Sequence, residues 1–173
     1  MKRRRLLSDD RGVATIEFAL WCSMFFVLII VALDFGMVRI YQMRLGAAVE
    51  QGAIIAFNQR TSLSTATGES IKTYVASASG LPGMSATSVY LDCNSKTLNS
   101  GCVSAGRIFR CLTINGSTYE FSAPQAQGSA CTGGATAGYY LTIIARYVYH
   151  PVIVPNSWLN NKTISAKTVL RLQ

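Results

Sequence analysis

The stretch GVATIEFALWCSMFFVLIIVAL, residues 12–33, decides how this chain folds. The 21 residues after its first glycine carry a single charge, Glu17, and a helix needs about 20 mostly apolar residues to cross a bilayer. A secretory signal peptide has a shorter apolar part that ends at a cleavage site with small residues, whereas the sequence DFGM, residues 34–37, follows here. The sequence therefore predicts a transmembrane helix over residues 13–33.

Basic residues are concentrated just before this apolar stretch. Residues 1–12 contain five Lys and Arg against two Asp, and Lys and Arg beside a membrane span remain in the cytoplasm. The part of the chain after the span is therefore predicted to be exported. Only 14% of the 173 residues are charged, which argues against a fully soluble cytosolic enzyme. The other Lys and Arg are dispersed along the sequence, and nucleic acid binding needs clustered ones, so no nucleic acid partner is predicted.

Helical character continues beyond the membrane length. Apolar residues recur without a proline as far as Phe57, so we predict one helix over residues 13–57, about 68 Å long at 1.5 Å per residue. This divides the chain into a basic leader (residues 1–12), a long helix (residues 13–57) and an exported α+β domain (residues 58–173).

Glu17 is the informative residue of the span. A carboxylate at the centre of a membrane helix costs about 2.5–3.5 kcal/mol, and such a residue is a functional-site hypothesis by default. The alternative is that Glu17 lies in the cytoplasmic headgroup layer, where the positive end of the helix dipole stabilises it.

The string GVATIEF, residues 12–18, resembles the processing site of type IV prepilins, with a basic leader, a small residue and an apolar helix whose fifth residue is glutamate. The resemblance implies that a prepilin peptidase cleaves after Gly12 and frees the amine of Val13. It also implies that Glu17, followed by Phe18, meets the amino terminus of a neighbouring subunit during assembly. An ammonium and a carboxylate that are buried among apolar helices each need a partner.

The longer string DRGVATIEFAL, residues 10–20, together with DFG at 34–36 and AAVEQGA at 47–53, is similar to the TadE-like pseudopilins of tight-adherence (Tad, type IVc) pilus systems. The similarity covers residues 11–57. The chain departs from the family at Trp21-Cys22-Ser23, where members usually carry a proline. The major pilin of these systems is a very short chain, so the resemblance implies a minor pilin that primes assembly, caps the tip or sits in the shaft.

The resemblance also implies partners and a location. The partners are the prepilin peptidase, the major and other minor pilins, the inner-membrane assembly platform and, before assembly, the lipid bilayer. The chain is expected in the bacterial inner membrane, with its N-terminus in the cytoplasm and its C-terminal domain in the periplasm. After assembly it is expected outside the cell, in a pilus that serves surface adherence.

Four of the five cysteines lie in the exported part: Cys93, Cys102, Cys111 and Cys131. In an oxidising compartment they predict two disulfides with three possible connectivities. Structural zinc sites have paired ligands two to four residues apart, whereas these gaps are 9, 9 and 20 residues. Disulfides are therefore favoured over zinc, and no metal site is predicted.

The predicted fold class is α+β, with the long N-terminal helix packed on an antiparallel sheet, as in pilins, and with disulfide-stapled loops. Residues 69–78 have helical periodicity, and residues 139–150 and 163–172 alternate as strands. Asn115-Gly116 between two alternating runs predicts a hairpin in which both residues take a positive φ. A group of tyrosines suggests a sticky surface, although alternation places half of them in the core: Tyr139, Tyr140, Tyr147 and Tyr149.

Nothing in the sequence predicts catalysis or a cofactor. His150 is the only histidine, it precedes Pro151, and no helix-spaced carboxylate accompanies it. The phosphate-binding loop motif does not occur. Two functions remain: a minor pseudopilin, and a single-pass membrane-anchored receptor or envelope scaffold that never enters a filament. An enzyme with a signal anchor is a more distant third.

Overall fold

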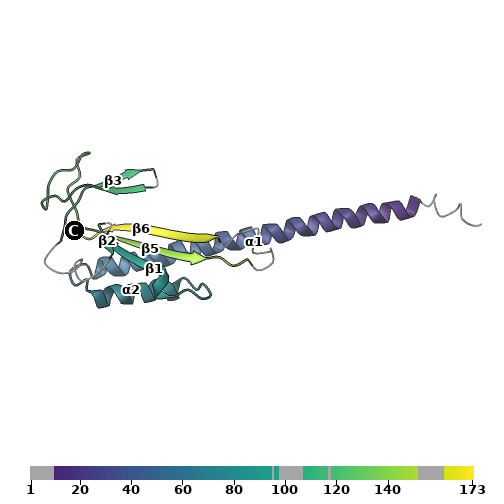
Figure 1. Ribbon diagram of the computed structural model, residues 1–173, viewed down its shortest axis with the longest axis horizontal. Coiled ribbons are helices and arrows are strands. Elements are labelled where there is room, and N and C mark those ends of the chain that lie inside the picture. Colours follow the sequence, from purple (N-terminus) through teal and green to yellow (C-terminus); the bar gives the residue numbers. More distant parts are fainter. Residues whose placement is uncertain (1–9, 95, 98–106, 117, 152–161) are drawn as a thin grey trace, which may run out of the picture. The chain divides into compact units, whose positions relative to one another are not determined.

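The computed structural model describes residues 10–94, 96–97, 107–116, 118–151 and 162–173 (Figure 1). Its first element is the helix α1, Asp10–Asn58, of 49 residues. The helix predicted over residues 13–57 is thus present, with a few more residues at its start. The chain divides into two compact units, residues 1–39 with 150–162, and residues 40–149 with 163–173.

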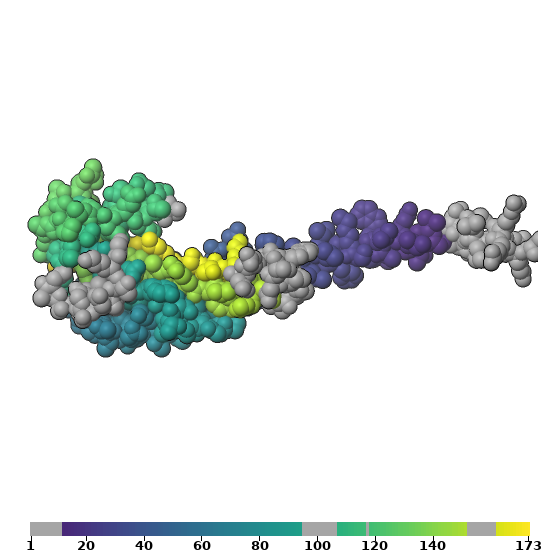
Figure 2. All heavy atoms as spheres, in the orientation of Figure 1, coloured from purple at the N-terminus to yellow at the C-terminus, as the bar shows by residue number. Residues whose placement is uncertain are grey.

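The first unit contains the beginning of α1. From Gly12 to Leu33 this segment exposes apolar side chains all around the helix, and they are uncovered on the face that Figure 2 shows in purple and blue. Asp34 differs from its surroundings, because only 1% of its surface is exposed. No sequence pattern predicted that this carboxylate is buried.

The second unit contains the end of α1 and all other elements (Figure 1). These are α2 (Thr65–Ala78), the 3-10 turn η1 (Ala86–Ser88), β1 (Val89–Cys93), β2 (Lys96–Thr97), β3 (Leu112–Asn115), β4 (Thr118–Phe121), β5 (Tyr140–Val148) and β6 (Thr163–Arg171). A four-stranded sheet has the order β2-β1-β5-β6, and β3 and β4 form a separate hairpin. All of the pairs are antiparallel. The predicted α+β fold with an antiparallel sheet is confirmed.

The sheet separates its two faces by strict alternation. One face of β5 is buried throughout, as predicted from the sequence, and so are its partners in β1: Leu141, Ile143, Ala145 and Tyr147, with Val89 and Leu91. Figure 1 shows α2 on one side of the sheet and the β3–β4 hairpin on the other. The other face is covered by the hairpin only at one end, where the rings of Phe121 and Tyr140 lie 5.8 Å apart.

The distal part of α1 packs against the buried face through a close approach at Gly52. A Cβ added to Gly52 would collide with Cγ2 of Val75 in α2, and it would lie 3.8 Å from Cδ1 of Ile143 in β5. Glycine is therefore what allows α1, α2 and the sheet to meet at this point. Fully buried neighbours on the same helix face, such as Leu45 and Val49, complete the core.

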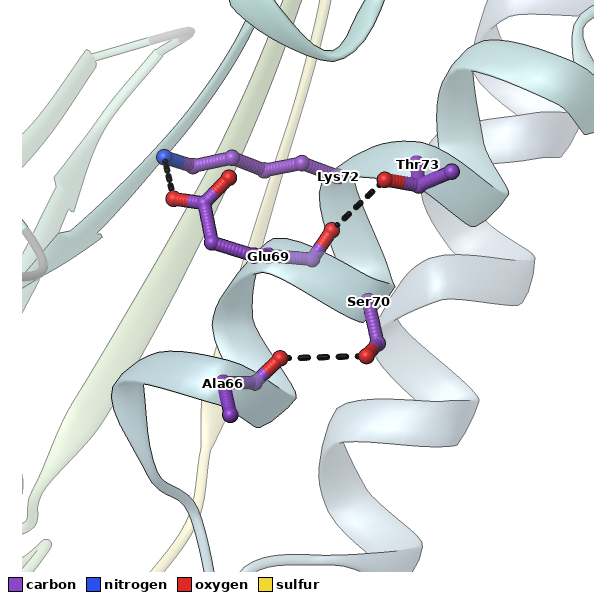
Figure 3. Close-up of polar contacts among 5 residues, drawn as sticks. All are labelled: Ala66, Glu69, Ser70, Lys72 and Thr73. Carbon is purple, nitrogen blue, oxygen red and sulfur yellow. Dashed lines mark hydrogen bonds and ion pairs between the residues drawn. The ribbon is translucent and has the colours of Figure 1, made fainter.

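The helix α2 begins earlier than the predicted residue 69, at Thr65. The reason is its cap, because the hydroxyl of Ser64 accepts a hydrogen bond of 3.1 Å from the amide of Thr67. Its outer face is polar and locally satisfied (Figure 3): Lys72 forms an ion pair of 2.8 Å with Glu69. Ser70 and Thr73 donate to backbone oxygens four residues earlier.

The turn of the β3–β4 hairpin begins one residue later than predicted. The register pairs Asn115 with Thr118, so Asn115 belongs to β3, and Gly116 is the residue that takes a positive φ, 61°. Asn115 does not adopt the left-handed conformation. The hairpin prediction is right, but the expectation of a positive φ at both Asn115 and Gly116 is wrong.

The predicted sticky tyrosine surface is also wrong. Tyr139, Tyr140, Tyr147 and Tyr149 are all buried. Tyr41 of α1 makes edge contacts with the rings of Tyr147 and Tyr149, with centroids 5.8 and 5.6 Å apart. Burial, and to a smaller extent the nearby Tyr41, raises the pKa of Tyr147 above its ordinary value of 10.0, and its hydroxyl donates to the backbone oxygen of Pro82 over 3.2 Å.

Candidate assembly segment

The segment from Gly12 to Leu33 is a helix with no buried residue among those described. Most of its large apolar side chains are more than half exposed, for example Phe18 and Trp21 at 71% and Phe26 at 63%. Contiguous apolar surface of this kind marks a membrane or protein interaction site. Among the described helices one, Gly12–Asn58, is long and apolar enough to cross a membrane, judged by length and composition.

Glu17 is exposed on this segment, between the exposed Ile16 and Phe18. Ten Leu, Ile, Phe and Val side chains lie between Phe18 and Leu33, and at roughly 0.3–0.6 kcal/mol each they favour insertion by about 3–6 kcal/mol. A carboxylate costs about 2.5–3.5 kcal/mol at the centre of a membrane helix and less near its end. Membrane insertion therefore tolerates Glu17, whereas burial of the same carboxylate among apolar helices without a partner is strongly unfavourable.

The predicted processing site lies near the start of α1. The helix begins at Asp10, so Gly12 and Val13 both have helical backbone. Gly12 has open space around it, with nothing within 4 Å of an added Cβ. Because glycine disfavours a helix by about 1 kcal/mol relative to alanine, this first turn unwinds more easily than the turns that follow.

The distal part of α1 exposes a second apolar surface, on the side away from its buried face. Its members recur every three or four residues, about half a turn from Leu45, and most are apolar: Ile40, Met43, Ala47, Glu50, Ile54 and Phe57. Met43 is 72% exposed and Ile54 is 62% exposed. We call these six residues the outer seam. Sequence analysis missed it, although the spacing alone signals a second amphipathic face.

The cysteines lie elsewhere, and the structure joins Cys111 to Cys131, with their Cα atoms 5.6 Å apart. Cys93 is buried at the end of β1, and Cys102 lies outside the described residues. If two disulfides form, this leaves the connectivity that pairs Cys93 with Cys102. Within the described ranges, no three His, Cys, Asp or Glu side chains form a group that could hold a metal ion.

The comparison with protein families finds a match to the TadE-like protein family over residues 12–53. This segment is TadE-like. Neither the curated proteins nor the solved structures contain a match to the chain. The TadE-like match confirms, over residues 12–53, the resemblance drawn from the sequence.

The TadE-like segment lies entirely within α1, which continues for five residues beyond it. It begins at Gly12, the residue of the predicted cleavage, and ends at Ala53, next to the close approach at Gly52. It includes the exposed apolar helix and the part of α1 that packs on the sheet. The sheet, the hairpin and α2 follow after it.

Proposed function

We propose that this chain is a minor pseudopilin of a Tad (type IVc) pilus, which a prepilin peptidase cleaves after Gly12. The observation that carries the proposal is the exposed apolar helix of residues 12–33, which lies in the TadE-like segment and has one carboxylate, Glu17, near its start. Before assembly the bilayer covers this helix. In a filament the helices of other pilins replace the lipid.

Cleavage after Gly12 makes Val13 the first residue and Glu17 the fifth. The new ammonium on Val13 and the carboxylate of Glu17 then lie in one turn of the helix, at the membrane surface. When helices bundle without water, each charge needs a counter-charge. Glu17 of an incoming subunit pairs with the terminal amine of its neighbour, and this pair fixes the axial stagger between subunits.

The outer seam offers a further apolar surface to a neighbouring pilin. Met43 and Ile54 are exposed on α1 while the opposite helix face is buried in the core. A neighbouring pilin helix that lies along this seam removes its apolar side chains from water. The partners are therefore the major pilin and other minor pilins, with the assembly platform in the inner membrane, and the assembled protein contributes to surface adherence.

Processing is tested by the mass of the chain after expression in cells with an active or an inactive prepilin peptidase. We expect an N-terminus at Val13 with the active enzyme and at Met1 with the inactive one. A chain that keeps its leader in both strains, and that fractionates only with membranes, would support a membrane-anchored receptor or scaffold and contradict the proposal.

The role of the carboxylate is tested by Glu17→Ala, with Glu69→Ala as the matched control. Glu69 is an exposed glutamate on α2, whose side chain is 61% exposed. We expect Glu17→Ala to leave membrane insertion intact and to reduce the pilin recovered in sheared filaments at least tenfold. The control variant should assemble like the wild type, and normal assembly of Glu17→Ala would count against the pairing.

A further inference from the structure

The sheet face turned away from the helices gathers basic and aromatic side chains that are far apart in the sequence. Alternation places Tyr90 of β1, Arg146 of β5, and Lys167 and Arg171 of β6 on this face. Tyr90 and Lys167 flank the same β5 residue in the register. The hairpin adds Tyr119, whose ring centroid lies 4.8 Å from Nζ of Lys167. We call these five residues the basic face.

The cations of the basic face outnumber the acidic side chains near them. Residues 121–173 contain no Asp or Glu. In the part of the chain that the structure describes, the ion pair of Lys72 with Glu69 lies on α2 (Figure 3), and no Asp or Glu side chain lies within 4 Å of the cationic nitrogens of Arg146, Lys167 or Arg171.

Two other carboxylates lie near this region without neutralising it. Asp92 of β1 lies on the same sheet face as Tyr90 by the same alternation, but it is half-buried and is paired in register with Thr97 and Thr142. Glu120 lies on the exposed face of β4 and accepts a hydrogen bond of 3.2 Å from Nδ2 of Asn115. The basic face is therefore a surface of net positive charge.

Three cations follow one another along this face. Arg146 is the diagonal neighbour of Lys167 across the β5–β6 pair, a separation of about 7–8 Å. Lys167 and Arg171 are four residues apart on β6, or roughly 13 Å. Like charges at these distances repel one another unless an anion lies between them, so a ligand with several regularly spaced negative charges suits this row.

The row ends beside an open hollow of about 370 Å³ that is lined by Arg107, Phe109, Gln127 and Gln173. Nη1 of Arg107 donates to Oε1 of Gln173 over 2.6 Å, and Nε of Arg171 donates to the backbone oxygen of the same residue over 3.0 Å. A guanidinium, two amides and an aromatic ring are the groups that bind the carboxylate, hydroxyls and apolar ring face of an acidic sugar.

The aromatic rings distinguish between polyanions. Single-stranded nucleic acid stacks its bases on uncovered aromatic faces. Here the guanidinium of Arg146 lies over Tyr90, 5.4 Å from the ring centroid, and Lys167 lies over Tyr119. These rings hold the cations in place and present charge rather than stacking platforms.

We propose that the basic face and the adjoining hollow bind an extended acidic polysaccharide, with Arg146, Lys167 and Arg171 contacting successive carboxylates. Binding of this kind would attach the exported domain to a surface glycan or matrix polymer. It goes beyond the pilin role and does not depend on it, because none of its residues lies in the TadE-like segment.

The proposal is tested with the full chain in nanodiscs of phosphatidylcholine, a lipid without net charge, with alginate as the polyuronate probe. The test variant is Arg146→Gln/Lys167→Gln, since both side chains are exposed and neither has a hydrogen bond in the described residues. The matched control is Arg60→Gln/Lys72→Gln, which removes the same charge away from the basic face. Calorimetry at 50 and 200 mM NaCl measures the affinity.

We expect the test variant to lose alginate affinity about tenfold or more, because each basic residue contributes several-fold to binding at an anionic surface. The control should change less than twofold, added salt should weaken binding, and neutral dextran should not bind. A charge-retaining Arg146→Lys/Lys167→Arg variant should keep the affinity. The proposal would be overturned if the test and control variants lost equal affinity, or if alginate did not bind at 50 mM NaCl. It would also be overturned if dextran bound as tightly as alginate, or if single-stranded DNA bound more tightly.

Discussion

The two parts of α1 are both rich in apolar residues, but their surroundings differ. Before Asp34 the helix exposes apolar side chains on every side, and after Arg39 it buries one face and exposes the other. Leu28 is 57% exposed, whereas Leu45 is fully buried. Apolar content alone therefore does not make a core, and a helix face enters the core only where the chain supplies a partner, here α2 and the sheet.

The largest expected effect is on the free energy of unfolding, which should respond to substitutions in the distal part of α1 and not to substitutions in the first part. Leu45→Ala removes a fully buried side chain and should lower the free energy of unfolding by about 2–5 kcal/mol. Leu28→Ala should change it by less than about 0.5 kcal/mol, because that side chain contacts no core. Urea denaturation of the full chain in detergent measures both, and similar losses in the two variants would contradict the division.

A charge introduced into the first part of α1 should instead impair insertion of the chain into the membrane. Phe26→Asp places a carboxylate at the middle of the predicted span, at a cost of about 2.5–3.5 kcal/mol. We expect most of the chain to leave the membrane fraction, as measured by carbonate extraction. Phe57→Asp, on the outer seam, is the control and should stay in the membrane. Loss of both variants from the membrane would place the membrane boundary beyond Asp34.

A smaller effect tests the close approach at Gly52. An added methyl group collides with Val75, so Gly52→Ala should destabilise the fold by about 1–3 kcal/mol. Gly46→Ala is the matched control on the same helix, because nothing lies within 4 Å of its added Cβ. It should stabilise the chain by up to about 1 kcal/mol through helix propensity. Thermal unfolding of the two variants should shift in opposite directions.

Sequence alone predicted the features that depend on local patterns. The apolar run from Val13 to Leu33 is recognised by its length and its lack of charge, and the alternation of β5 and β6 reports which face of each strand is buried. Sequence did not predict where the basic residues gather, because their positions depend on how the strands pair. Tyr90 lies on β1 at one edge of β5, and Lys167 lies on β6 at the other edge of β5. The pairing of Cys111 with Cys131 depends on similar long-range contacts.

The smallest effect concerns pH and the contact between α1 and β5. The raised pKa of Tyr147 means that the folded chain holds this proton more tightly than the unfolded chain. Stability from this group is complete below pH 10 and is lost as the pH rises through the folded pKa. Unfolding in urea at pH 9 and pH 11 should show a smaller loss for Tyr147→Phe than for the wild type. An equal loss would mean that Tyr147 does not carry the alkaline sensitivity.

The most direct test of the account is the N-terminus of the chain in purified, sheared pili. If the first part of α1 serves as a membrane anchor and then as a filament helix, mass spectrometry should find this chain in the filaments with Val13 as its first residue. Recovery of the chain only in the membrane fraction, beginning at Met1, would contradict the account.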